Sequence, residues 1–260
     1  MDITDNIVEM NDLVKIYPTF NVGSIKDFFT KRQSNALNTV DSSLRFHREI
    51  ALDKLTLDIP KGCKYGVLGH NGSGKSTLLS VILGVLKPDD GEITVHGRSV
   101  GLLEMGSGFH PELSGTENVM LYLSILGISI SDAKALLPSI VSFCELGNAM
   151  TSALRTYSAG MVTRLAFSVL CHVPTDIFLV DEVLAVGDYS FQLKCMDFME
   201  NFSKEGGTIV FVSQDPTTLI NMCDSGLCLH EGKAKAVGVM DEVAGIYVET
   251  MEKLKKDAEK

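Results

Sequence analysis

A run of nine residues has the composition needed to hold phosphate groups. Residues 69–77 satisfy the pattern G-x-x-x-x-G-K-[ST] at every constrained position. The glycines let the backbone turn so that successive N–H groups converge, and a helix starting here adds its positive end. Lys75 can reach β- and γ-phosphates, and the Ser76 hydroxyl can bind magnesium. The alternative is a glycine-rich turn with an incidental Lys-Ser pair. The predicted binding residues are Gly69, His70, Asn71, Gly72, Ser73, Gly74, Lys75, Ser76 and Thr77.

The flanking residues provide the context that this loop needs. Residues 65–68 are an apolar run short enough for a buried strand, and residues 78–83 continue as a helix. About a hundred residues later, the apolar strand 176–182 ends in Asp181-Glu182. Both carboxylates are then expected at the carboxyl edge of the sheet, where open α/β sheets bind ligands. Asp181 can hold magnesium opposite Ser76, and Glu182 can polarise a water for attack on the γ-phosphate. The alternative is a pair of exposed turn residues.

The remaining pattern predicts a wound α/β domain with a mainly parallel sheet, because strands and helices alternate along the chain. Further strands are expected at 7–17, ending in a turn at Pro18, and at 51–59, 92–97 and 207–213. Helices are expected over 120–146, with breaks near Gly127 and Pro138, and over 162–173, 191–202 and 217–223. A glycine-rich connector covers 98–117. A connector of this length in a compact domain is usually functional.

Composition narrows the possible partners. The net charge of −10 argues against nucleic acid as the main partner, since nucleic-acid binding usually requires a basic surface. The six cysteines contain no C-x-x-C pair and are expected to be reduced core residues. No uncharged stretch approaches the length of a membrane helix. Any membrane crossing is therefore expected to belong to another chain.

Two segments stand out from the domain pattern. Residues 19–48 form an insertion with six basic or histidine side chains and scattered phenylalanines. They are either a solvated loop or a basic patch that faces a partner or lipid headgroups. Residues 251–260 are dense in Lys and Glu and are predicted to be a solvated helix or a frayed tail.

The segment Tyr157-Ser158-Ala159-Gly160-Met161 resembles the signature motif of the ATP-binding-cassette (ABC) family, usually Leu-Ser-Gly-Gly-Gln. It keeps the serine and the second glycine at a predicted helix start, where an anion is favoured. The resemblance implies a P-loop NTPase of the ABC type, an α/β fold with an antiparallel β subdomain and a helical subdomain. The implied domain spans residues 1–250, with the helical subdomain at about 112–172. It also implies a head-to-tail homodimer with two ATP molecules and Mg²⁺ at the interface. Ser158 and Gly160 would then complete the partner's ATP site, and Asp188 matches the following loop that crosses the dimer.

Three stretches narrow the resemblance: residues 104–115, 157–161 and 182–188. Together they are similar to the ATPase subunits that export O-antigen, capsular polysaccharide or teichoic acid, and the match covers about residues 7–248. This similarity implies an ATP hydrolase that works with a separate integral-membrane permease on a lipid-linked glycan. The implied location is peripheral, at the cytoplasmic face of the cell membrane.

Three positions leave questions open within this resemblance. Glu104 or Met105 stands where cassettes usually have glutamine, as in the polysaccharide exporters. Gln214 replaces the family's switch histidine; it can hydrogen-bond but cannot carry a proton at neutral pH, so slower hydrolysis is expected. Tyr17 is expected to stack on adenine, with Phe46 or His47 as alternatives. The alternative functions are a nucleotide-gated clamp with low turnover and the ATPase subunit of another ABC transporter.

Overall fold

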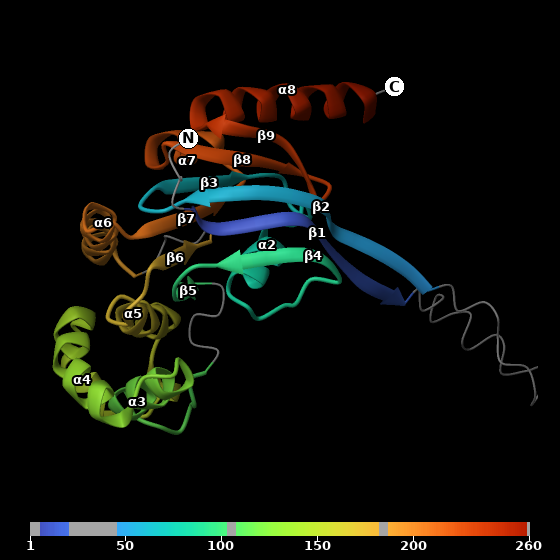
Figure 1. The fold of residues 1–260 in the computed structure, drawn as a ribbon. Helices are drawn as coiled ribbons and strands as arrows, with labels where there is room; N and C mark the ends of the chain where they lie inside the picture. The colour runs from blue at the N-terminus through green and yellow to red at the C-terminus, as the bar shows by residue number, and fades with distance from the viewer. Residues whose placement is uncertain (1–5, 21–45, 103–107, 182–186, 259–260) are drawn as a thin grey trace, which may run out of the picture.

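The computed structural model describes residues 6–20, 46–102, 108–181 and 187–258. Two β-sheets are flanked by helices, as Figure 1 shows. The strands are β1 (Asn6–Phe20), β2 (Phe46–Pro60), β3 (Lys64–Leu68), β4 (Asp90–Val95), β5 (Ser99–Gly101), β6 (Ile177–Val180), β7 (Thr208–Ser213), β8 (Ser225–His230) and β9 (Lys233–Val239). The helices are α2 (Lys75–Ile82), α3 (Gly115–Ile125), α4 (Ile130–Cys144), α5 (Ala159–Leu170), α6 (Tyr189–Lys204), α7 (Pro216–Met222) and α8 (Met240–Ala258), with short 3₁₀ helices η3 (Gly147–Thr151) and η4 (Leu154–Thr156).

The larger sheet has six strands in the order β5-β6-β7-β3-β8-β9. All neighbouring pairs are parallel except β8 with β9, which confirms the prediction of a mainly parallel sheet. Every residue of β6 and β7 is buried. Strands covered on both faces need continuous apolar runs, which is the pattern of these two segments.

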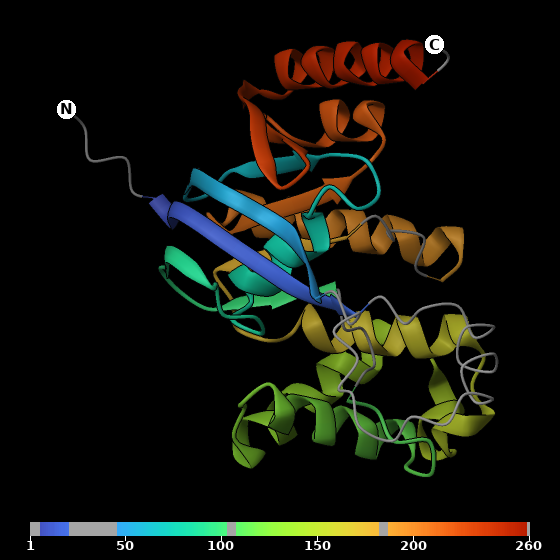
Figure 2. The ribbon, with the colours of Figure 1, turned by 90° about the vertical axis from the view of Figure 1, so that its right-hand side faces the viewer.

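The smaller sheet is antiparallel, in the order β2-β1-β4. Its inner side chains share a hydrophobic core with α2 and with one face of the larger sheet. Figure 2 shows α2 lying behind the long β1–β2 pair. Because side chains alternate along a strand, Ile177 and Leu179 of β6 enter this core, whereas Phe178 and Val180 face the opposite core.

The opposite core is covered by helices, and α3, α4 and α5 form a separate group below the sheet in Figure 1. The start of α3 is well defined. Ser114 caps it in a capping box with Glu117. Just after the cap, the buried Asn118 amide bonds the backbone N–H of His110 and the carbonyls of His110, Leu113 and Ser114. These bonds fix the chain that enters the helical group.

Two predicted interruptions are wrong. Pro18 does not end the first strand, which continues to Phe20 with Pro18 opposite Arg48. The pairing of β1 with β4 stops at Val14, so Pro18 lies on a part of β1 with a single strand partner, where a missing N–H is tolerated. Pro138 lies inside α4 on its exposed side. The predicted break near Gly127 is confirmed, because α3 ends at Ile125 and Gly127 has a positive φ of 76°.

The strands β5, β8 and β9 and the 3₁₀ helices η3 and η4 were not predicted, and α8 was predicted only over its last part, as one of two alternatives. The insertion predicted over residues 19–48 ends earlier than expected, because residues 46–48 belong to β2. Residues 21–45 lie outside the described part of the chain. Residues 251–258 continue α8.

All six cysteines are free, as predicted. Among the described residues, no helix combines the length and the apolar composition needed to cross a membrane.

Candidate functional site

The phosphate loop joins β3 to α2, as predicted. Gly74 precedes α2 with φ of 106°, a left-handed conformation, and a side chain there would overlap the Ala51 carbonyl oxygen. The Lys75 ammonium donates to the carbonyls of Gly69 at 2.7 Å and His70 at 2.9 Å. Its side chain is nearly buried, so the charge is held by the loop itself. The loop therefore presents one fixed cation beside a glycine-rich backbone.

A cleft of about 400 Å³ opens over this loop. It brings together eight predicted residues from three separate parts of the chain, among them Tyr17 of β1, Lys75 of α2, and Asp181 directly after β6. The full lining is Tyr17, Glu49, Ile50, Ala51, Asn71, Gly72, Gly74, Lys75, Ser76, Thr77 and Asp181. One cation, two carboxylates and several loop residues thus share a cleft that has an aromatic side chain on its wall.

The aromatic wall is built by the β1–β2 pair. Tyr17 lies directly opposite Glu49, and Ile50 is 49% exposed although it is a large apolar residue. Glu49, Ile50 and Ala51 were not predicted as site residues. In the sequence, the only signal near these residues is the alternating strand predicted to start at Ala51. It could not identify them as site residues, because cross-strand register decides which residues meet Tyr17.

Gln214 lies beside the phosphate loop. It follows β7, and the register that pairs Leu68 with Ser213 places it next to Gly69. The Gly69 N–H donates to the Ser213 carbonyl at 3.3 Å, which ties the two strand ends together. Gln214 is exposed and does not line the cleft.

Gly69, His70 and Ser73 belong to the predicted loop but do not line the cleft. Ser73 is fully buried, and the His70 ring packs against His230 of β8. Glu182 lies outside the described residues. Glu104 and Met105, the two alternatives for the position where cassettes usually have glutamine, lie outside them as well.

Ser158, Gly160 and Asp188 are also absent from the cleft lining. Ser158 is the N-cap of α5 and accepts from the Met161 N–H. Asp188 is the N-cap of α6, where it accepts from the Phe191 N–H at 2.9 Å. Ser158 and Asp188 thus cap the starts of two helices, and neither lines the cleft of its own chain.

The start of α6 is linked to the helical group through one arginine. Arg164 of α5 pairs with Asp188 at 3.4 Å and with Glu145, the residue after α4, at 2.5 Å. Its guanidinium also lies 4.6 Å from the centroid of the Phe191 ring. The Lys194 ammonium donates to the other Glu145 oxygen, and its hydrogen bond together with the charge of Arg164 lowers the pKa of Glu145.

The sequence profile described as ABC transporter matches residues 52–185. The chain is also 36% identical over 249 residues to the O-antigen export system ATP-binding protein RfbB of Klebsiella pneumoniae, covering 94% of this chain and 98% of that relative. The chain belongs to the ABC transporter family. It is therefore an ATP-binding and ATP-hydrolysing cassette, and the predicted family is confirmed.

Two further comparisons agree with this ABC assignment. The teichoic acids export ATP-binding protein TagH of Bacillus anthracis is 34% identical over 248 residues, covering 95% of this chain and 43% of that relative. A solved dimeric ATP-binding cassette in a post-hydrolysis state with ADP and Pi has a TM-score of 0.68 at 19% identity, covering 90% of this chain and 98% of that one. This last likeness confirms the predicted ABC fold.

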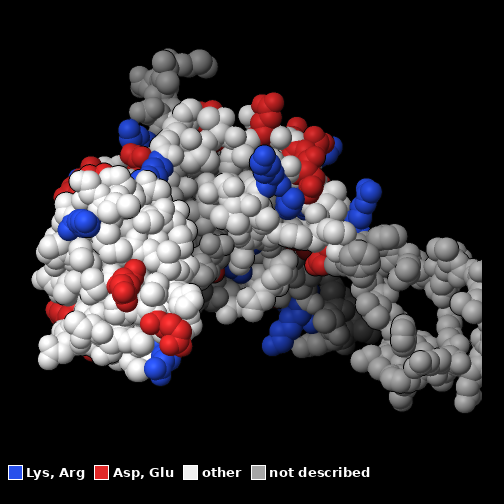
Figure 3. All heavy atoms as spheres, turned by 90° about the horizontal axis from the view of Figure 1, so that it is seen from below, with Lys and Arg blue, Asp and Glu red and all other residues white. Residues whose placement is uncertain are grey.

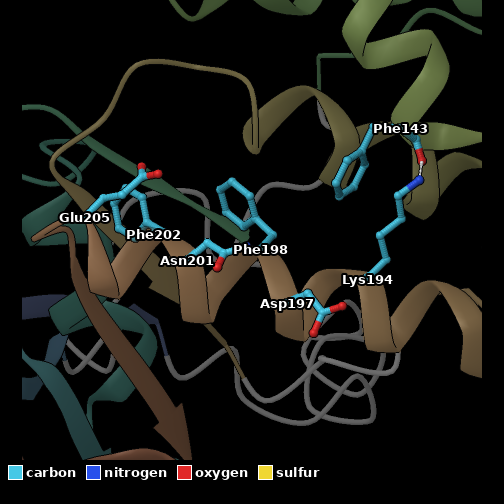
Figure 4. A pocket seen from close by; sticks show the side chains of 7 residues that line it. All are labelled: Phe143, Lys194, Asp197, Phe198, Asn201, Phe202 and Glu205. Carbon is cyan, nitrogen blue, oxygen red and sulfur yellow. Dashed lines mark hydrogen bonds between the residues drawn. The ribbon is translucent and has the colours of Figure 1, made fainter.

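A second cleft of this ABC cassette, of about 320 Å³, lies between α4 and α6 (Figure 4). Phe143, Phe198 and Phe202 give it an apolar wall, and Lys194 donates to the Phe143 carbonyl at 3.0 Å at one end. No part of the phosphate loop reaches it. The first cleft is therefore the candidate nucleotide site.

The surface of the cassette seen from below carries scattered charges of both signs (Figure 3). On this face the described residues form no continuous basic stripe of the kind that follows a nucleic-acid backbone.

Proposed function

We propose that this chain is the motor subunit of an exporter that moves a lipid-linked polysaccharide, of the O-antigen, capsule or teichoic acid type, across the cytoplasmic membrane. The names of the relatives support this substrate class, because two of them, an O-antigen and a teichoic acid export protein, match more than nine tenths of this chain. The chain acts at the cytoplasmic face of that membrane as a peripheral subunit, bound to a separate integral-membrane permease.

The observation that carries the nucleotide-binding part is the shared cleft. Lys75 lies where it can bind β- and γ-phosphate oxygens, and Tyr17 provides a ring on which adenine can stack. Ser76 and Asp181 contribute a hydroxyl and a carboxylate to the same cleft, and hard oxygen donors of this kind fit Mg²⁺. When bound, magnesium would neutralise charge on the phosphate oxygens.

Hydrolysis needs a group that activates water. Glu182 follows Asp181 directly and is the proposed general base, a role worth about 10²- to 10⁴-fold in rate. Gln214 is placed next to the first glycine of the loop and orients the attacking water by hydrogen bonds. Unlike histidine it cannot take up a proton at neutral pH, so we expect slow turnover.

Two copies complete the sites in the proposed mechanism. Ser158 and Gly160 are at the start of α5 and Asp188 at the start of α6, outside the cleft of their own chain. A head-to-tail homodimer brings them to the ATP bound by the other copy. Closure on two ATP molecules and release after hydrolysis then drive the permease.

The first experiment is steady-state ATP hydrolysis by the purified chain and by Glu182→Gln, with size-exclusion chromatography in Mg-ATP. We expect the parent to turn over and Glu182→Gln to be inactive but trapped as a dimer, because it keeps every nucleotide contact. A Glu182→Gln variant as fast as the parent would refute the assigned base.

A nucleotide-gated clamp with low turnover is the second candidate, and Gln214 is the observation that favours it. Gln214→His distinguishes the two functions. If the parent is inert yet dimerises with ATP, and the histidine variant hydrolyses ATP, the clamp is supported. If the parent is active and Gln214→His hydrolyses ATP no faster, the reason for proposing the clamp is removed.

A further inference from the structure

The turn between β8 and β9 lies against the phosphate loop. Its two central residues, Glu231 and Gly232, both have positive φ, of 48° and 75°, as a two-residue type I′ hairpin requires. The Gly232 N–H donates to the Ser73 carbonyl at 3.0 Å, and the Gly232 carbonyl accepts from the Asp53 N–H of β2 at 3.0 Å. The turn thus connects the loop to the smaller sheet.

Two more contacts join the same segments. A side chain at Gly69 would overlap the Leu229 carbonyl oxygen, so these backbones are in close contact. The rings of His70 and His230 meet edge to face, with centroids 5.0 Å apart and planes at 69°. His230 is only 8% exposed, so its ring is held in one place at the end of β8.

This junction concentrates buried polar atoms that have no partner. Among the described residues five buried side-chain atoms lack a hydrogen bond, and three of them are here: His70 Nε2, His230 Nδ1 and Ser73 Oγ. Buried polar atoms without a partner are uncommon and oppose folding. The three unpaired atoms therefore add no hydrogen-bond stability to the packing of the two histidines at this junction.

The backbone of His70 links this junction to Lys75. Its carbonyl accepts from the Lys75 ammonium at 2.9 Å and from the Ser73 N–H at 3.1 Å, while its Nδ1 lies 2.7 Å from the Asn71 carbonyl. A shift of the His70 backbone would therefore move a carbonyl that holds Lys75. The His230 ring packs against the ring of this same residue.

We propose that His230 is a positioning residue of the nucleotide site: its ring fixes His70 and, through the His70 carbonyl, directs Lys75 toward the phosphates. This inference rests on the proposed ATP binding at the phosphate loop. It does not depend on the exported substrate or on the permease. The role predicts an effect on nucleotide affinity and little effect on the chemical step.

The charge around His230 makes the contact sensitive to pH. Burial lowers the pKa of His230, Glu231 of its own turn opposes this, and His70 of the loop and Lys235 of β9 add to the lowering. The ring is therefore neutral at pH 7.5. Protonation on acidification puts a charge on a buried ring and weakens its contact with the His70 ring. If the loss of this contact outweighs the attraction of the added charge for the phosphates, ATP affinity falls as pH decreases, and this is the result that we expect.

The test uses the full chain with His230→Ala, His230→Phe and the control His96→Ala. The His96 side chain is 55% exposed and lies directly after β4. Isothermal titration with ATP and steady-state kinetics are measured at pH 7.5. We expect His230→Ala to raise Kd and KM about tenfold with kcat changed less than twofold. His230→Phe keeps the ring contact and should remain within about twofold of the parent, as should His96→Ala.

A second measurement, the pH dependence of ATP binding, distinguishes a positioning role of His230 from a purely packing role. Between pH 7.5 and 5.5 the Kd of the parent should rise about threefold more than that of His230→Phe, which cannot be protonated; this comparison also serves if His230→Ala does not fold. Equal ATP affinities of the parent and His230→Ala, with only a lower Tm, would overturn the inference. Equal pH dependence of the parent and His230→Phe would overturn it as well. Absence of ATP binding by the parent would instead refute the proposed function, and this inference with it.

Discussion

Arg164 is the side chain that joins α4, α5 and the start of α6, and its removal gives a stability change that can be worked out from its contacts. Its side chain is 15% exposed, whereas its partners Glu145 and Asp188 are 53% and 65% exposed. Each bridge to such an exposed carboxylate contributes about 0.5 kcal/mol. The contact with the Phe191 ring adds about 0.5–1 kcal/mol.

We therefore expect Arg164→Met to lower the free energy of unfolding by about 1.5–2 kcal/mol, or the Tm by about 5 °C. Methionine keeps the apolar stem of the side chain in place. Water solvates the two carboxylates left behind, since both are more than half exposed, so no buried charge is stranded. Urea unfolding measures the loss, and an unchanged slope shows that the denatured state is the same.

The matched control is Arg155→Met, which removes a bridge to Glu112 at 3.3 Å with both side chains more than 60% exposed. This control should cost less than about 0.5 kcal/mol. A double-mutant cycle of Arg164→Met with Glu145→Gln should give a coupling of about 0.5 kcal/mol. The reasoning fails if the two arginine variants lose the same stability, or if the coupling is zero.

Four further changes test other parts of the structure. Tyr17→Ala should weaken ATP binding about tenfold in a titration, and Tyr17→Phe should bind like the parent, because the ring does the stacking. Asn118→Ala should cost about 2–3 kcal/mol in urea unfolding, since its buried amide serves four backbone groups. Hydrogen bonds from Ser114 lower the pKa of Glu117. The Glu117 carboxylate therefore contributes stability above its usual pKa of 4.5, and this contribution is lost as pH falls through the pKa of the folded state. Glu117→Gln should flatten the dependence of Tm on pH between pH 3 and 6. Burial raises the pKa of Cys195 to about 12, so its thiol should react with a disulfide reagent at pH 8 only after unfolding.

Each of these has a result that would contradict it. Equal ATP affinities of the Ala and Phe variants at Tyr17 would exclude stacking. The control for Asn118 is the exposed Asn148, and comparable losses at both positions would count against the amide network. A Tm profile of Glu117→Gln that equals the parent's between pH 3 and 6 would contradict the role of that carboxylate. A Cys195 thiol that reacts in the native protein as fast as in the unfolded protein would contradict its predicted protection.

Two of the strands that escaped prediction, β5 and β9, have weak local patterns. β5 has three residues, and β9 reads Lys-Ala-Lys-Ala-Val-Gly-Val, in which lysine, alanine and glycine are poor strand formers. β9 exists because β8 provides an antiparallel partner joined by a two-residue turn. Pro18 was misread for a related reason: whether a proline can stay in a strand depends on which edge has a neighbour, and pairing decides that.

The phosphate loop and its strand–loop–helix setting could be predicted from the sequence alone, because consecutive residues determine them. Three glycines, a lysine and a serine at fixed spacing require one backbone path, and the apolar run before them requires a buried strand. The cap at Ser158 and the apolar run that ends in Asp181 have the same local character.

Only the tertiary structure decided which distant residues share the site. Strand pairing places Tyr17 and Asp181 at the loop that contains Lys75, and the register of β1 with β2 adds Glu49 and Ile50. The β8–β9 turn brings His230 against the loop from more than 150 residues away in the sequence. Such contacts depend on strand order and register, which are set by the packing of the whole chain, since local patterns give a strand its faces but not its neighbours.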